Sequence, residues 1–336
     1  MEEDFTWVDG ERLIRFGRGT LAAAPRLLAA RGFERYALLT TERAQASSAA
    51  LAEGAEIVLH VPAGPVPDAA AAIRDAVQGH PVVALGGGRV VDVAKAIASA
   101  DGLGCAVLPT TLAGSPMTPF HRMPAGSAAA PLVRPSLVVW DPDLAGSLPR
   151  GQLTATAMNA LAHGFEALYA PLANPVAELA ALRAAELFAR ALPDEEPDRA
   201  EVALAALLAS YAVGTTGFAV HHAVCQTIVR VSGTPHAETN AVMLPHTVDL
   251  MAHRAPGAVG RFAAALGDPD GDPVNATGHV ARLSAETGVD GLRRLGFDIE
   301  LVPKVVETVG RHPALGNTPG GAPSAAELEA LVAGAL

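Results

Sequence analysis

The chain has 336 residues, of which 50% are hydrophobic and only 18% are charged, so it can bury a large core and is not a disordered chain. At ~100–200 residues per domain, this length predicts two domains or one large one. The net charge of −11, without any run of lysine and arginine, argues against nucleic acid as a partner.

Cysteine content and hydropathy bear on the compartment. Cys105 and Cys225 are too few for a disulfide framework, which favours a reducing environment. Residues 1–17 have no apolar signal core, and no uninterrupted apolar run reaches ~18 residues. The most apolar stretch, 203–220, is interpreted as a buried helix. We therefore expect a cytoplasmic protein without a membrane partner.

The first 150 residues alternate between strands and helices. Asp9-Gly10 separates two short apolar segments, which predicts a β-hairpin over residues 5–17. Further strands are expected at 36–41, 56–61, 81–88 and 105–111, and helices at 21–32, 66–79 and 90–102. Apolar strands that alternate with helices predict a parallel sheet covered by helices, an α/β nucleotide-binding type of domain.

The pattern changes near residue 150. From there to the end, alanine- and leucine-rich segments show helical periodicity and little strand character. We therefore place an α/β domain at 1–150 and an all-helical domain at 151–336. Residues 268–278 and 311–323 are predicted to be surface loops because they are rich in Pro, Gly and Asn.

A glycine-rich turn is the first candidate site. Gly86, Gly87 and Gly88 stand between a predicted strand and a predicted helix, where a backbone can approach a pyrophosphate and a helix start offers free N–H groups. The pattern is not GxGxxG, so a purely structural turn is an equal alternative. Thr110 and Thr111 follow the next strand, and in a parallel sheet both segments reach the same rim. These threonines could instead merely cap or turn the chain.

Four ordered blocks carry a resemblance. They are GGGRVVDVAK (86–95), PTTLAGSPMTP (109–119), MNALAHGFEALYA (158–170) and HHAVCQTIVRVSGTPHAETNAVMLPH (221–246). Together they resemble the signature blocks of the iron-containing alcohol dehydrogenase family, in particular its maleylacetate reductase branch. The resemblance implies the dehydroquinate synthase-like fold, NADH or NADPH as cofactor, a small carbonyl substrate and a homodimer.

The resemblance also assigns the cofactor contacts. They are Thr41, Gly86, Gly87, Gly88, Arg89, Thr110 and Thr111. Thr41 stands where an Asp would bond the adenosine ribose and repel a 2′-phosphate, so we expect NADPH to be tolerated. Arg89 replaces a usual Ser and could either bind the phosphate or crowd the turn.

The metal site of the family is incomplete in this chain. Its Asp and three His ligands correspond to Asn159, His163, His222 and His236. A neutral amide is a poorer ligand for a dication than a carboxylate. Three interpretations stay open: neutral donors or general acids beside a substrate carbonyl, which we favour; a weakened metal site; and hydrogen-bonded structural histidines.

Other departures fall in the same blocks. Gln226 replaces a histidine that the family often places near the substrate, and Pro116, Val229 and Arg230 are also unusual. The catalytic candidates are therefore Asn159, His163, His222, Gln226 and His236. We expect an NAD(P)H-dependent reductase of a small oxo acid or aldehyde that requires no metal. The alternative is a non-redox lyase, cyclase or isomerase, or an inactive homologue, in a specialised biosynthetic pathway.

Overall fold

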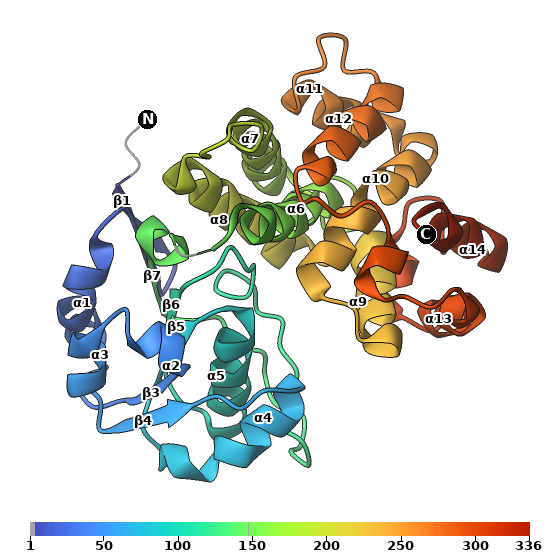
Figure 1. Cartoon of the computed structure of the whole chain (residues 1–336). Coiled ribbons are helices and arrows are strands. Elements are labelled where there is room, and N and C mark those ends of the chain that lie inside the picture. Colours follow the sequence, from blue (N-terminus) through green and yellow to red (C-terminus); the bar gives the residue numbers. More distant parts are fainter. Residues whose placement is uncertain (1–3, 147) are drawn as a thin grey trace. The chain divides into compact units, whose positions relative to one another are not determined.

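The computed structural model describes residues 4–146 and 148–336. The chain divides into two compact units, Met1–Ser147 (unit 1) and Leu148–Leu336 (unit 2). Among the described residues, every strand belongs to unit 1, and unit 2 is built from helices (Figure 1). This is the α/β plus all-α architecture that the sequence predicts.

Unit 1 is built on a seven-stranded sheet in the order β1-β2-β7-β6-β5-β3-β4. The strands are β1 (Phe5–Asp9), β2 (Arg12–Phe16), β3 (Ala37–Thr40), β4 (Ile57–His60), β5 (Val82–Gly86), β6 (Cys105–Pro109) and β7 (Leu137–Trp140). Only the β1–β2 hairpin is antiparallel. Gly86 pairs with Pro109, so the carboxyl ends of β5 and β6 lie side by side.

Burial explains which strands are central. Every residue of β3, β5, β6 and β7 is buried, as expected for strands covered on both faces, whereas β1 and β4 alternate between half-buried and exposed positions at the edges. The helices of unit 1 are α1 (Ala24–Ala30), α2 (Glu42–Gln45), α3 (Ala49–Glu53), α4 (Val66–Ile73) and α5 (Gly88–Asp101). One apolar cluster joins α1 and α3 to the sheet through Leu28, Leu51 and Leu85.

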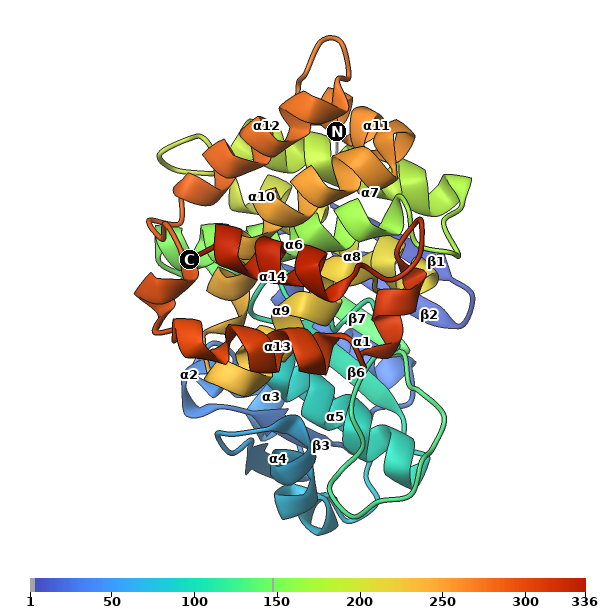
Figure 2. The ribbon, with the colours of Figure 1, turned by 90° about the vertical axis from the view of Figure 1, so that its right-hand side faces the viewer.

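Unit 2 is arranged around its central helix, α6 (Arg150–Ala167). Its other helices are α7 (Pro175–Ala191), α8 (Arg199–Thr216), α9 (Val220–Ser232), α10 (His236–Arg254), α11 (Pro256–Ala265), α12 (Pro273–Ala285), α13 (Val302–Val309) and α14 (Ala325–Gly334). α6 is fully buried from Ala157 onward and packs against α7, α8, α10 and α12. α13 and α14 lie side by side over α9 and α10 (Figure 2). Small alanine side chains allow these helices to pack closely.

The structure corrects several details. Strand β7 and the short helices α2 and α3 were not predicted. Residues 268–278 are not all loop, because Asp272 accepts a hydrogen bond from the Val274 N–H at 2.9 Å and starts α12 at Pro273. Residues 313–317 form a short 3₁₀ turn within the second predicted loop.

The predicted buried helix over 203–220 is present as α8, which ends at Thr216 before Gly217 with φ of 86°. No single helix of the described chain is long and apolar enough to cross a membrane. α8 and α9 pass that test as a pair, with a bend of 101° between them.

Candidate cofactor and catalytic sites

The glycine turn of unit 1 is tightly packed. A Cβ on Gly86 would lie 2.7 Å from Val90 Cγ2, one on Gly87 3.2 Å from Thr111 Cγ2, and one on Gly88 3.0 Å from the Cβ of Ala113. Each glycine therefore has a packing reason. The same turn also leaves the start of α5 without a side-chain cap, since Gly87 occupies the N-cap position. The positive end of a 14-residue helix is thus available to an anion.

The threonines expected at this rim lie beside the glycine turn. The Thr110 N–H donates to the Gly86 carbonyl at 3.0 Å, which joins the two segments directly. Thr110 and Thr111 are half-buried, and the Thr111 hydroxyl accepts only a long, 3.4 Å bond from the Ala113 N–H. Their side chains therefore retain hydrogen-bonding capacity.

Thr41 and Arg89 complete the cofactor candidates. Thr41 follows β3, the neighbour of β5, and caps α2 by accepting a bond from the Ala44 N–H at 3.2 Å. Arg89 is exposed in the first turn of α5. The residues assigned from the resemblance thus lie at the carboxyl ends of the adjacent strands β3, β5 and β6 or just beyond them.

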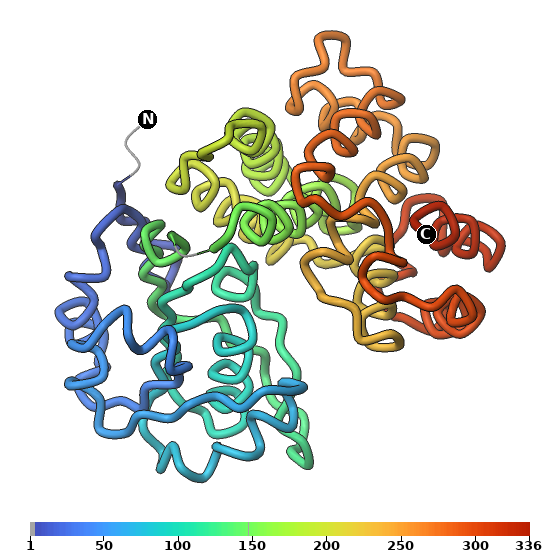
Figure 3. The backbone as a smooth tube through the Cα atoms, viewed as in Figure 1, coloured from blue at the N-terminus to red at the C-terminus, as the bar shows by residue number. Residues whose placement is uncertain are grey.

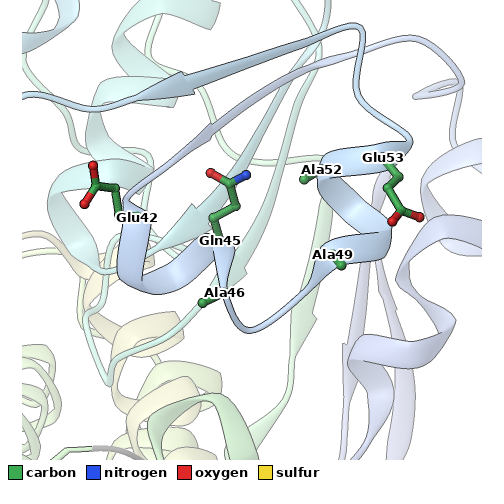
Figure 4. A pocket seen from close by; sticks show the side chains of 6 residues that line it. All are labelled: Glu42, Gln45, Ala46, Ala49, Ala52 and Glu53. Carbon is green, nitrogen blue, oxygen red and sulfur yellow. The ribbon is translucent and has the colours of Figure 1, made fainter.

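A shallow pocket lies between α2 and α3 (Figure 4). Its lining consists of Glu42, Gln45, Ala46, Ala49, Ala52 and Glu53. Both of its charged side chains are carboxylates, which would repel a phosphate. The pocket is separate from the glycine turn, and we assign it no role.

The histidine cluster lies in unit 2. Asn159 and His163 are one turn apart on α6, as predicted, and His222 comes from the first turn of α9. The rings of His163 and His222 stack with centroids 4.6 Å apart and planes inclined by 14°. Phe218 covers the other side, 4.5 Å from the His222 ring. The side chains of Asn159, His163 and His222 are all at least nine-tenths buried.

A buried glutamate, which the sequence analysis missed, orders this cluster. Glu166 lies one turn beyond His163 on α6 and is fully buried. Its Oε2 is 2.6 Å from Nδ1 of His222, and its Oε1 accepts a bond from the His222 backbone N–H at 3.2 Å. Because His163 and Glu166 are three residues apart, they lie on one face of a helix, and this spacing could have indicated from the sequence that Glu166 is near His163.

Burial controls the charges in the cluster. It raises the pKa of Glu166 to about 7, because a charged carboxylate is costly away from water. Burial also holds the pKa of His163 and His222 well below the usual range, so both imidazoles are neutral. For both rings, the proximity of His236 lowers the pKa further.

Three polar atoms of the cluster have no hydrogen-bond partner among residues 4–146 and 148–336. They are Asn159 Oδ1, His163 Nδ1 and His222 Nε2. Buried polar atoms are nearly always bonded, so three together indicate a place for a polar ligand or water. The structure thereby unites three of the predicted catalytic residues.

The other candidates are more peripheral. His236 is exposed at the start of α10, where the Asn240 amide donates to its backbone carbonyl at 2.7 Å. Gln226 is half-buried one turn after His222 on α9. His221 is structural, because its two ring nitrogens contact Thr247 Oγ1 at 2.8 Å and Asn240 Oδ1 at 3.0 Å. Arg230 is exposed at the end of α9.

A metal ion does not fit the cluster as it is arranged. Ring lone pairs lie in the ring planes, and the stacked, nearly parallel rings of His163 and His222 place theirs in separate planes. The donor at position 159 is a neutral amide rather than a carboxylate. Across residues 4–146 and 148–336, no group of three or more His, Cys, Asp or Glu side chains has metal-binding geometry.

Comparisons with known proteins agree on one family. Residues 12–142 match the model for iron-containing alcohol dehydrogenase, and residues 153–333 match the C-terminal model of the same family.

Curated relatives include a maleylacetate reductase from Sphingobium indicum, 33% identical over 319 residues that cover 89% of both chains. Another, maleylacetate reductase 2 from Cupriavidus pinatubonensis, is 39% identical over 233 residues, which cover 66% of this chain and 65% of that enzyme. The structure of a maleylacetate reductase from Agrobacterium tumefaciens superposes with a TM-score of 0.86 at 28% identity, covering 100% of this chain and 99% of the other. The chain therefore belongs to the iron-containing alcohol dehydrogenase family.

Proposed function

We propose that this protein is an NAD(P)H-dependent reductase of a small oxo acid, similar in activity to maleylacetate reductases. Support comes from family membership and from the reductase names of the curated relatives. The observation that carries the chemistry is the Glu166–His222 pair, in which His222 Nε2 has no hydrogen-bond partner in the part of the chain that the structure describes. We infer an oxo acid rather than an aldehyde as the substrate because the curated relatives are named maleylacetate reductases.

The two units have different tasks in this proposal. Unit 1 is the dinucleotide-binding domain, in which the α5 N-terminus and the Thr110 and Thr111 hydroxyls bind the pyrophosphate. Arg89, exposed beside that helix start, adds a positive charge. Unit 2 supplies the groups that bind the carbonyl oxygen. When bound, the nicotinamide supplies the hydride that reduces the carbonyl carbon.

The histidine cluster would act on the oxygen. As the carbonyl oxygen gains negative charge, a proton on His222 Nε2 is donated to it, and Glu166 returns a proton to Nδ1 through the 2.6 Å contact. Proton count is conserved, since the carboxyl loses the proton that the alcohol gains. His163, stacked on His222, stabilises the oxygen with a ring N–H, and Asn159 orients the substrate. His236 and Gln226 would contact the rest of the substrate.

This chemistry needs no metal, because the hydrogen-bond donors replace the Lewis acid. We further infer a cytoplasmic homodimer from the family resemblance. The two free cysteines, Cys105 and Cys225, are buried, which suits a reducing compartment. Light scattering of the purified protein would test the dimer.

Turnover assays test the proposal. Consumption of NADH and NADPH is followed with maleylacetate and related oxo acids, before and after dialysis against a chelator. We expect activity that survives the chelator. Glu166→Gln and His222→Asn should each lower kcat by about 10²–10⁴-fold, the usual contribution of a general acid. His253→Asn, at an exposed position of α10, is the matched control and should retain activity.

Two results would count against it. If the folded wild-type protein binds neither NADH nor NADPH, the non-redox alternative replaces the reductase. If both substitutions in the Glu166–His222 pair leave kcat unchanged, the pair is structural and another group supplies the proton.

A further inference from the structure

A second network of buried charge lies in unit 1, and the proposed chemistry does not use it. Lys95 lies on α5 with its side chain fully buried. Its Nζ contacts the carbonyl oxygens of Ser115 at 3.0 Å and Phe120 at 2.6 Å. It also contacts Ser115 Oγ at 3.0 Å and Asp92 Oδ1 at 3.4 Å. All four atoms can accept a hydrogen bond, so each N–H of an ammonium has a partner here, and these contacts oppose the burial that lowers the pKa of Lys95.

Ser115 closes the network. Its hydroxyl accepts a bond from Lys95 and donates its own proton to the Asp92 carboxylate in a short contact. Asp92 lies one turn before Lys95 on the same helix and supplies the opposite charge. A buried lysine is costly unless it is paired and fully bonded, so such a network fixes its members firmly.

The network holds one end of a long irregular segment. Residues 110–136 join β6 to β7 without a helix or strand (Figure 3). The segment begins with Thr110 and Thr111. Lys95 binds this segment at the carbonyl oxygens of Ser115 and Phe120, which are four and nine residues after Thr111.

A second buried cation grips the same segment. Arg12, on β2 and 2% exposed, donates to the Pro116 carbonyl at 3.3 Å and to the Pro135 carbonyl at 3.2 Å. Two buried cations from different elements thus bind neighbouring carbonyls, those of Ser115 and Pro116.

α5 connects this network to the glycine turn. The helix starts at Gly88, where a Cβ would lie 3.0 Å from the Cβ of Ala113, and Lys95 follows two turns later on the same face. Residues 110–113 are therefore held between the start of α5 and the Lys95 network. Their position relative to the helix N-terminus depends on both contacts.

We propose that Lys95, Asp92 and Ser115 form a positioning group that fixes Thr110 and Thr111 against the α5 N-terminus and so sets the affinity for the nicotinamide cofactor. The inference rests on the proposed function, because it concerns the same cofactor site. None of the three side chains is proposed to touch the cofactor. The group acts on binding and not on the chemical step.

The test separates positioning from stability. Lys95→Met would leave buried carbonyls unbonded and could fail to fold, so the main variant is Ser115→Ala. It removes one hydroxyl and keeps the Lys95 bonds to both carbonyls. We expect Kd for NADH, measured by nicotinamide fluorescence, to rise about five-fold or more, while kcat at saturating cofactor stays within about two-fold. Asp92→Asn should act in the same direction.

Ser99→Ala is the matched control. Ser99 lies one turn beyond Lys95 on α5, and its hydroxyl donates to the Pro131 carbonyl at 2.7 Å, far along the same segment from Thr110. It should lower the melting temperature as Ser115→Ala does but leave Kd unchanged.

Each remaining outcome overturns the proposal. If Ser115→Ala lowers the melting temperature but leaves Kd unchanged, or if Ser99→Ala raises Kd equally, the network only stabilises the fold. If the wild-type protein itself binds neither NADH nor NADPH, the reductase proposal fails together with the positioning proposal. If the wild-type protein binds a cofactor but Ser115→Ala binds it equally well, only the positioning proposal fails.

Discussion

Gly86 offers the sharpest test of how the glycine turn is built. In Gly86→Ala, the new Cβ would lie 2.7 Å from Val90 Cγ2 and 2.8 Å from Val90 Cβ. Carbon atoms in good contact are about 3.5–4.0 Å apart, so the overlap is roughly 1 Å. Val90 is 3% exposed and β-branched, and no rotamer change moves its Cβ. The backbone must therefore shift.

The expected cost follows from two opposing effects. Overpacking of this kind costs about 1–3 kcal/mol. A smaller gain of about 0.4–1 kcal/mol arises because alanine restricts the unfolded chain. We expect a net loss of about 1–2 kcal/mol, which corresponds to a melting temperature lower by roughly 2–8 °C for a unit of this size.

Differential scanning calorimetry measures the shift, with two reference variants. Gly316→Ala has no atom within 4 Å of the new Cβ, so its melting temperature should match that of the wild-type protein. In Gly87→Ala, the new Cβ meets the Thr111 side chain, with Cγ2 at 3.2 Å and Oγ1 at 3.5 Å, and the variant should lose less stability than Gly86→Ala. It nevertheless places a methyl group beside the proposed phosphate site. A Gly86→Ala protein as stable as Gly316→Ala would refute the packing argument.

Three further predictions follow from particular contacts. Thr41→Asp should keep α2 intact, since Asp also caps helices, and should weaken NADPH relative to NADH by about ten-fold or more in KM. Arg254 and the Ser324 capping box lower the pKa of Glu327 to about 2, so its stabilising contribution is complete above its ordinary value of 4.5 and disappears as pH falls toward 2. The melting-temperature gap between wild type and Glu327→Gln should therefore close on acidification. Phe165→Ala, which removes a fully buried ring 4.8 Å from that of Phe262, should cost about 3–5 kcal/mol in chemical denaturation, and an effect below about 1 kcal/mol would contradict the assigned core.

Most of the fold follows from local patterns. The alternation of apolar strands with helices predicts the parallel sheet, and the Asp9-Gly10 turn predicts the hairpin. β7 was missed because Leu137–Trp140 is only four residues long and follows a segment without a crossover helix. α2 and α3, of four and five residues, are too short to show periodicity and depend on contacts with the rest of unit 1.

The residues of the candidate site also differ in whether the sequence alone reveals them. Asn159 and His163 share a helix face, so their spacing alone brings them together. His222 joins them only because the fold brings the first turn of α9 against His163 and Glu166, which no spacing reveals. Glu166 was missed for that reason, because its partner is 56 residues away in sequence. A buried carboxylate needs a bonding partner, and that partner becomes visible only in the folded chain.

Charge balance gives a physical reason for the amide at position 159. The cluster already contains one buried carboxylate, Glu166, which lies two turns from Asn159 on the same face of α6. The stacked imidazoles of His163 and His222 are neutral and do not offset it. With Asp at position 159, two carboxylates would share this apolar site, and a dication would be needed to balance them. With Asn159, a single proton shared between Glu166 and His222 suffices. In the proposed mechanism, the neutral amide at position 159 and the histidine–glutamate proton donor therefore belong to one electrostatic arrangement.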